Sequence, residues 1–262
     1  MHARLAKDAM YLPTDDCRSD LTRSTHASLP AYDVVIPCYN RAHVVGDALA
    51  SVLAQDHAPT RIVLVDDGSS DNSDAVIRRL ASMHANVEAA VLPRNGGASN
   101  ARNVGVSLCT APWVAFLDSD DIWLPGAARA LLDQAAGHDI IVGSFARVEG
   151  NAMPGEPECG WSGGDIRRAL ATGGVIGPSW SIVRRAIVTA VAGFDPSFHN
   201  CNDWDFYTRA AADGARFARI DRCVALYRTV AGARLVDDDA INAVNARRVR
   251  AHPYLADLLQ PA

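Results

Sequence analysis

The chain has 262 residues, of which 49% are hydrophobic and 21% are charged, and its formal net charge at pH 7 is -5. This composition excludes disordered and fibrous proteins, and the length is enough to bury one large core. The acidic balance offers no basic surface that would neutralise many phosphates, so we expect no nucleic-acid partner. Any phosphate that the protein binds would need a metal ion or backbone amides.

Six cysteines are spaced far apart, without the close pairs of a zinc site or a redox motif. We therefore expect reduced thiols in a cytoplasmic protein. No stretch approaches the ~20 apolar residues that span a bilayer. Residues 1–30 hold several aspartates and no continuous apolar segment, unlike a secretory signal. Contact with the inner face of a membrane would then depend on a partner.

Residues 1–30 are polar and unpatterned, and we treat them as an extension in front of the domain. From Tyr32 onward, short β-branched runs alternate with segments whose apolar residues follow helical spacing. This alternation predicts an α/β fold with right-handed crossovers, a mostly parallel sheet and helices on both faces. The predicted strands are Asp33–Pro37, Arg61–Val65, Val87–Leu92 and Trp113–Leu117, and the predicted helices are His43–Gln55, Ser73–Met83 and Gly96–Leu108.

The pattern is less regular after Ile122, but the core does not end there. We predict a single domain made of residues 31–124 and 125–236, with a helical tail at 237–262. Glu149–Gly164 is rich in Gly, Pro and Glu and is a candidate lid. The other predicted helices are Ala127–Ala136, a helix from Asp203 or Trp204 to Asp213, and one from Asp237 to Leu259 with a break at Pro253. The other predicted strands are Asp139–Phe145 and one or two short strands within Arg216–Tyr227. Ile182–Val191 would form either a strand or a helix.

Polar clusters follow three of the predicted strands, at the carboxyl ends where α/β sheets form their ligand crevice. Asp118-Ser119-Asp120 places two carboxylates one residue apart after an apolar strand. Oxygen ligands of this kind suit Mg2+ or Mn2+, which usually bind substrate phosphates as well. A solvated acidic turn would explain the same three residues, so this motif alone does not decide the function.

The other two clusters also have two interpretations each. Asp66-Asp67-Gly68-Ser69 would either form a turn that caps the next helix or accept a hydrogen bond from the imide N–H of a pyrimidine base. Pro37-Cys38-Tyr39-Asn40-Arg41 would either form a solvated loop or offer its aromatic ring and its cation to a base and a phosphate.

These three clusters, together with the glycine-containing segment Asn95–Asn103, resemble the family 2 glycosyltransferases of the GT-A fold from about Tyr32 to Leu124. The resemblance is specific, because four separate matches fall at the correct strand ends. It implies that residues 31–124 bind a nucleotide sugar. Residues 125–236 would bind the acceptor and carry the catalytic base.

The resemblance also implies roles for single residues. Asp66, or else Asp67, would contact the base. Asp118 and Asp120 would hold the ribose, the diphosphate and a Mn2+ or Mg2+ ion, with Asp120 as the direct metal ligand, while Asp121 would cap the following turn. The rest of the predicted nucleotide-sugar pocket is Pro37, Tyr39, Arg41, Asn95 and Ser119, closed or braced by Arg102 and Asn103.

A later segment, Asn202-Asp203-Trp204-Asp205-Phe206, is similar to the part of the family in which an aspartate opens a helix and serves as catalytic base. Asp203 matches that aspartate, although Asn202 stands where Glu is usual. Without the family, Asp203 would be interpreted as a helix N-cap. Many relatives have a His after a late Tyr-Arg, but none follows Tyr227-Arg228, so the metal site would rely on Asp120 or on His199.

The implied reaction is a single displacement that inverts the anomeric centre of a nucleoside-diphosphate sugar, with UDP-sugars favoured. The acceptor would be a hydroxyl of a saccharide, a lipid-linked glycan, a natural product or a peptide. Two alternatives remain. A sugar-phosphate nucleotidyltransferase would need a glycine-rich basic loop where Cys38–Ala42 stands, and a non-catalytic module would only bind the nucleotide sugar. Trp161, Trp180 and Trp204 would stack on the acceptor or pack in the core.

Overall fold

The computed structural model describes residues 28–150, 152–229 and 239–258, and the account below concerns these residues. Most of the predicted extension at 1–30 lies outside them. The first half alternates strands and helices as predicted. Its elements are β1 (Tyr32–Cys38), α2 (Val45–Leu53), β2 (Arg61–Asp66), α3 (Ser73–Ser82), β3 (Val87–Val91), α4 (Gly97–Leu108) and β4 (Trp113–Phe116).

The strands form one sheet in the order β3-β2-β1-β4-β8-β6-β9-β5. β1, β2, β3 and β4 pair in parallel. β8 (Ser181–Arg184) is antiparallel to β4 and to β6 (Ile140–Glu149), whereas β9 (Phe217–Thr229) is parallel to β6. The short strands β5 (Ile122–Trp123) and β7 (Pro157–Glu158) add antiparallel pairs to β9 and β6. The predicted α/β fold with a mostly parallel sheet is confirmed, and every antiparallel pair involves a strand of the second half.

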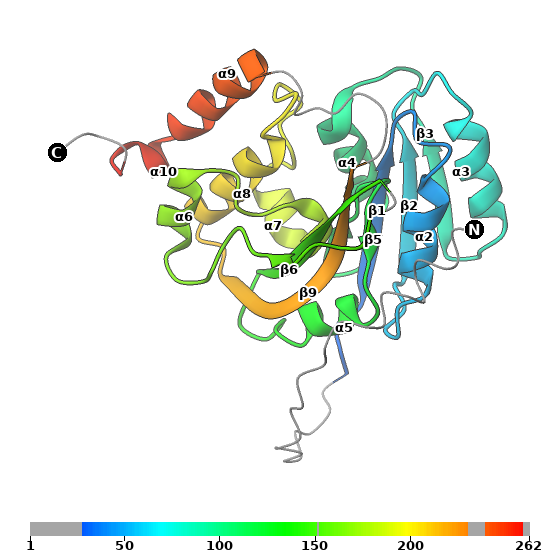
Figure 1. The fold of residues 1–262 in the computed structure, drawn as a ribbon, viewed down its shortest axis with the longest axis horizontal. Helices are drawn as coiled ribbons and strands as arrows, with labels where there is room; N and C mark the ends of the chain where they lie inside the picture. Colours follow the sequence, from blue (N-terminus) through cyan, green and yellow to red (C-terminus); the bar gives the residue numbers. More distant parts are fainter. Residues whose placement is uncertain (1–27, 151, 230–238, 259–262) are drawn as a thin grey trace.

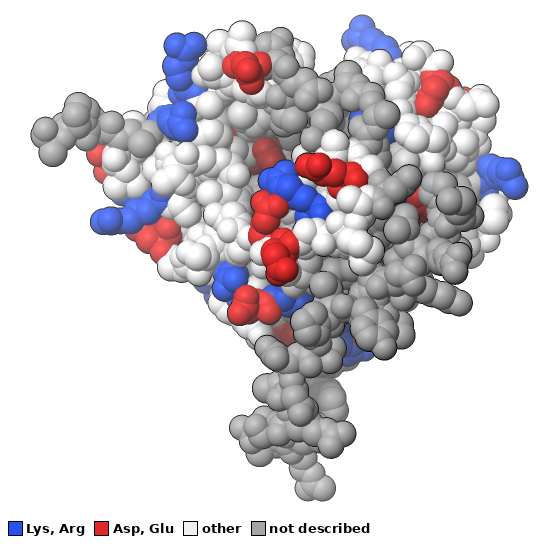
Figure 2. Space-filling view, viewed as in Figure 1, with Lys and Arg blue, Asp and Glu red and all other residues white. Residues whose placement is uncertain are grey.

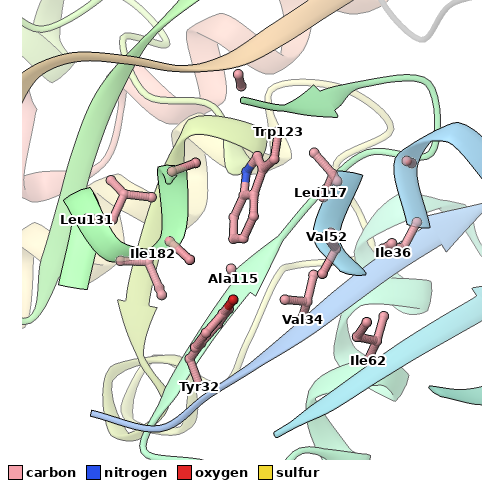
Figure 3. Close-up of a cluster of buried hydrophobic side chains, with 14 of the residues drawn as sticks. Tyr32, Val34, Ile36, Val52, Ile62, Ala115, Leu117, Trp123, Leu131 and Ile182 are labelled. Carbon is pink, nitrogen blue, oxygen red and sulfur yellow. The ribbon is translucent and has the colours of Figure 1, made fainter. Parts of the chain in front are cut away.

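Helices cover both faces of this sheet. Successive side chains of a strand point to opposite faces, so Val34 and Ile36 belong to one core and Val35 to the other. The first core is closed by α2, α3 and α5 (Ala127–Leu132), and Figure 3 shows part of it, with Trp123 between Leu131 and Leu117. The second core is closed by α4, α6 (Ile166–Thr172), α7 (Arg185–Ala190) and α8 (Asn202–Ala212). In Figure 1, α2 and α3 lie at one end of the molecule and α6 and α8 at the other.

Elements of the second half differ in detail from the prediction. The segment Ile182–Val191 holds both a strand and a helix, β8 followed by α7. β9 is a single strand of 13 residues rather than one or two short ones, and its pairing with β6 shifts register near Ser144. The tail forms α9 (Asp239–Arg250) and α10 (Pro253–Ala256), so the helix is interrupted directly before Pro253, at the break that the sequence predicted. Among the helices that the structure describes, none has the length and apolar character needed to cross a membrane.

Asp139 joins three strands at the edge of the sheet where β6 and β9 begin and β8 ends. Its carboxylate accepts hydrogen bonds from Nε of Arg216 at 2.9 Å and from Nε of Arg184 at 3.1 Å, next to β9 and β8. The bond from Arg216 is the main reason why the pKa of Asp139 falls to about 2. A lowered pKa means that the charged carboxylate is more stable in the folded protein than in the unfolded chain.

We expect Asp139→Asn to lower the free energy of unfolding by up to about 2 kcal/mol at pH 7. A group with a lowered pKa stabilises the fold above its unfolded pKa, and this contribution is lost as the pH falls. The difference from the wild type should therefore shrink between about pH 4 and the folded pKa of about 2. Urea unfolding across this range measures it, with the exposed Asp133→Asn as control. A difference independent of pH would contradict the assignment.

Candidate functional site

The carboxyl ends of β1, β2 and β4 open on a cavity of about 860 Å³ that both halves of the chain line. Figure 2 shows acidic and basic side chains gathered around a hollow near the middle of one face. Asp66, Asn103 and His199 do not line this cavity, whereas the other residues predicted for the nucleotide-sugar, metal and catalytic sites lie on its wall. The residues on the wall are Pro37, Tyr39, Arg41, Asp67, Asn95, Arg102, Asp118, Ser119, Asp120 and Asp203.

The two carboxylates predicted to hold a metal ion each contact an arginine. Nη2 of Arg102 lies 2.6 Å from Oδ1 of Asp118, and Nε of Arg41 lies 3.3 Å from Oδ2 of Asp120. Burial is the main cause that raises the pKa of Asp120, and the neighbouring charge of Asp118 adds to it. Two carboxylates whose charges repel each other in this way favour cationic partners, a requirement that the two arginines meet in this structure.

Asp121 has a structural role that goes beyond the predicted turn. Its buried carboxylate accepts a hydrogen bond from Oγ of Ser179 at 2.5 Å and one from the backbone N–H of Arg228 at 3.0 Å. Ser179 in turn accepts the N–H of Asp118 at 3.1 Å. Burial raises the pKa of Asp121 well above its usual value, followed by the charges of Asp118 and Asp120. Asp121 therefore fastens the loop after β4 to β9, and it is not on the cavity wall.

The structure separates the roles of Asp66 and Asp67. Both oxygens of the buried Asp66 carboxylate accept hydrogen bonds from Ser69, and Asp66 does not line the cavity. The turn that was the alternative interpretation of this motif is present, and the base contact predicted for Asp66, or else Asp67, stays a prediction. Asp67 lines the cavity and accepts the N–H groups of Gly96 at 3.0 Å and Gly97 at 2.7 Å, which ties β2 to the start of α4.

Glycine is required after these two aspartates. Gly68 has a φ of +67°, and a Cβ at this position would lie 2.4 Å from the backbone carbonyl carbon of Arg94. A side chain there would meet both backbone strain and a clash. The turn therefore brings the loop after β3, with Asn95, against the loop after β2.

The loops after β1 and β2 are joined by their own hydrogen bonds. Asn40, with a φ of +52°, accepts the N–H of Ser70 at 2.8 Å through Oδ1, and its own N–H donates to Oγ of Ser69 at 2.9 Å. The N–H of Arg41 donates to Oγ of Ser73 at 3.0 Å. Tyr39 is left 42% exposed on the cavity wall, so its ring has an open face for stacking.

Arg102 links the first half of the chain to α8. This arginine is 4% exposed, and its Nη1 donates to Oδ1 of Asn202 at 2.8 Å while Nη2 contacts Asp118. Asn103 does not line the cavity but bonds twice to the backbone of Phe194, at 2.7 and 2.8 Å. Closing the pocket and bracing it, the two roles predicted for this pair, therefore belong to different residues: Arg102 lines the cavity and Asn103 braces the segment before α8.

Asp203 lies in the first turn of α8, one residue after the helix begins at Asn202. It is not the N-cap, since that position is Cys201. Oδ1 of Asp203 accepts the N–H of Trp204 at 2.8 Å. Burial is the main cause that raises the pKa of Asp203 above the usual value of an aspartate. A raised pKa makes a carboxylate a stronger base, which offsets the weakening expected at a helix N-terminus.

Comparison with known proteins decides the family. The family model described as "Glycosyl transferase family 2" matches residues 33–187, which is more than half of the chain. The chain belongs to glycosyl transferase family 2. This confirms the resemblance inferred from the motifs, and the matched segment runs from β1 into α7.

Two curated relatives and one solved structure illustrate the place of this family 2 chain. Succinoglycan biosynthesis protein ExoU of Rhizobium meliloti is 29% identical over 72% of this chain and 59% of its own length. The Escherichia coli protein named UDP-Glc:alpha-D-GlcNAc-diphosphoundecaprenol beta-1,3-glucosyltransferase WfgD is 29% identical over 47% of this chain and 49% of its own length. This chain thus spans about half of each relative.

The structural comparison shows the fold. The crystal structure of S. aureus TarS 1-349 in complex with UDP-GlcNAc superposes with a TM-score of 0.69 and 20% identity, covering 87% of this chain and 71% of that one. At this identity the likeness concerns the arrangement of helices and strands. The predicted GT-A-type domain is confirmed by it.

The second half of this family 2 chain contributes an aromatic wall to the cavity. The rings of Phe145 and Trp180 stack with centroids 4.0 Å apart, and Tyr227 meets both edge-on. Arg147 and Glu158 form an ion pair of 2.7 Å beside them. All five side chains line the cavity. Sequence reasoning singled out Trp180 but missed the others, because β6, β7 and β9 meet only through the sheet.

Three other residues with predicted alternatives lie away from the cavity. Trp161 and Trp204 are buried in the second core, and Nε1 of Trp204 donates to the backbone oxygen of Leu170. His199 is exposed and does not line the cavity, so its place gives no support to a role as metal ligand. Within the described residues, no group of three or more His, Cys, Asp or Glu side chains is arranged to hold a metal ion.

Proposed function

We propose that this family 2 chain is an inverting glycosyltransferase that moves a sugar from a UDP-sugar to an acceptor hydroxyl, with Mn2+ or Mg2+ as cofactor. One observation carries the proposal: Asp118, Asp120 and Asp203 line a single cavity, and Arg102 bonds both Asp118 and Asn202, the residue next to Asp203. The same cavity would therefore hold the charged leaving group and the candidate base.

The donor half of the proposal rests on the chemistry of the cavity wall. Asp118 and Asp120 offer carboxylate oxygens, which suit Mg2+ or Mn2+ when phosphate oxygens and waters complete the shell. A divalent cation there would neutralise the charge of the leaving diphosphate. Tyr39 and Asp67 line the same cavity, which supports our proposal that they contact the base. UDP is favoured because WfgD is named for UDP-Glc and TarS was crystallised with UDP-GlcNAc.

Asp203 is the proposed base for the acceptor half. We assign the proton of the acceptor hydroxyl to Oδ2, because Oδ1 already accepts the N–H of Trp204. A single displacement needs one base and no nucleophile from the protein. Because the acceptor attacks the anomeric centre directly, that centre would invert. The aromatic wall of Phe145, Trp180 and Tyr227 suits the apolar face of a sugar ring. We therefore propose that the acceptor is a saccharide rather than a peptide or an aglycone.

The described cysteines are free thiols, which fits the cytoplasmic location that we propose, facing the inner side of a membrane if the acceptor is lipid-linked.

The proposed function is tested by incubating the protein with Mn2+ and a panel of UDP-, GDP- and dTDP-sugars and measuring release of the nucleotide. We expect slow hydrolysis of a UDP-sugar without any acceptor, and faster release when a saccharide acceptor is supplied. A nucleotidyltransferase would instead release pyrophosphate from a nucleoside triphosphate and a sugar phosphate. Binding without turnover of any donor would reduce the chain to a nucleotide-sugar-binding module and overturn the proposal.

A further inference from the structure

Arg41 and Arg102 each bind one of the two carboxylates that the proposed function gives to a metal ion. The Arg102–Asp118 contact is 2.6 Å, between side chains that are 5% and 33% exposed. The Arg41–Asp120 contact is 3.3 Å, between side chains that are 15% and 25% exposed. These pairs are largely shielded from water, so their attraction is stronger than that of surface ion pairs.

The neighbouring carboxylates do not provide a substitute ligand. Asp121 is buried and its two oxygens bind Ser179 and the N–H of Arg228. Within the part of the chain that the structure describes, no three His, Cys, Asp or Glu side chains are grouped to hold a metal ion. A lone cation would therefore have to displace two arginines and would gain only two protein ligands.

We propose that Arg41 and Arg102 exclude a free divalent cation from this site, and that the cation enters only together with the nucleoside diphosphate. The inference rests on the proposed function and adds an order of assembly to it. Within these two pairs the positive and negative charges cancel. A cation alone would leave an excess of positive charge, and a diphosphate alone would leave an excess of negative charge, whereas both together restore the balance.

A bound diphosphate would offer both arginines new hydrogen-bond acceptors. Guanidinium groups bind phosphate oxygens through paired N–H donors. Nε of Arg102 is buried and has no hydrogen-bond partner among the described residues, so one donor of this group is unused when Asp118 and Asn202 are bound. Both arginines line the same cavity. Phosphate oxygens that take these donors would release Asp118 and Asp120 to the cation.

The test is a titration of Mn2+ into the protein without nucleotide, followed by the electron paramagnetic resonance signal of free Mn2+, and repeated with UDP. We expect weak binding to the wild type and an affinity that rises on the order of 5- to 150-fold with UDP. Arg41→Gln should bind Mn2+ alone about tenfold more tightly or better, because an arginine at this distance lowers the affinity of a carboxylate for a proton by a similar factor.

Arg129→Gln is the matched control, because it removes an arginine that pairs with Asp56 at 2.5 Å outside the cavity. Its affinity for Mn2+ should equal that of the wild type, and thermal melts show that each variant is folded. An Arg41→Gln affinity no higher than the wild type, with UDP still bound, would overturn this inference and leave the proposed function standing. Failure of UDP, GDP and dTDP to bind with Mn2+ present would overturn both.

Discussion

Asp203→Asn should reduce sugar transfer roughly 10²- to 10⁴-fold, the usual contribution of a positioned general base. The amide keeps the size of the side chain and the hydrogen bond from the N–H of Trp204, but it cannot take a proton from the acceptor. Binding of UDP should stay within about twofold of the wild type, since Asp203 belongs to the acceptor half. Initial rates of transfer and calorimetric titration with UDP measure the two effects.

The acid limb of the pH profile gives a second measure of the same group. Burial raises the pKa of Asp203, so activity should fall as the pH drops through a value above that of an ordinary aspartate. Asp213→Asn, at the exposed end of the same helix, should leave both the rate and the pH profile unchanged. Full activity of Asp203→Asn would remove this residue from the mechanism.

Asp120→Asn should reduce turnover of the donor on the order of 10³-fold, because charge neutralisation by a metal ion is worth several kcal/mol and each ~1.4 kcal/mol is a factor of ten. The amide retains an oxygen for Arg41 but carries no charge, so the variant should fold and should lose the gain in UDP affinity that Mn2+ brings. Nucleotide release and UDP titrations with and without Mn2+ measure this.

Asp221→Asn is a suitable control, because that side chain is 90% exposed and does not line the cavity. It should match the wild type in both assays. If Asp120→Asn turned over the donor at the wild-type rate in Mn2+, the metal site would have to lie elsewhere or be unnecessary.

The first half of the fold was predictable because each strand is a buried β-branched run and each helix has an apolar face. Residues such as Val34 and Val35 are apolar on both sides of the sheet, which is typical of a covered parallel strand. The second half was less predictable. The long strand β9 is only partly apolar, and its pairing with β6 depends on contacts between segments about 80 residues apart.

The candidate site shows the same limit. Motif spacing placed Asp118, Asp120 and Asp203 correctly on one cavity, although they come from distant segments. It favoured Asp66 over Asp67, because the sequence does not show which of two adjacent carboxylates a turn will use. In the structure Ser69 holds Asp66 in the turn and Asp67 lines the cavity, while the base contact itself stays a prediction. Ser179 was also missed as an anchor of the loop that carries Asp118 and Asp120, since no local pattern connects it to Asp121.

The hydrogen bonds between the loops after β1 and β2 have a consequence for how such proteins diverge. Asn40 depends on Ser69 and Ser70, and the backbone of Arg41 depends on Ser73, so neither loop keeps its shape without the other. A mutation in one loop would be retained only with a compensating change in its partner. The two loops should therefore be inherited together, and a chimera that exchanges one of them alone between relatives should lose the shape of the cavity wall that they form.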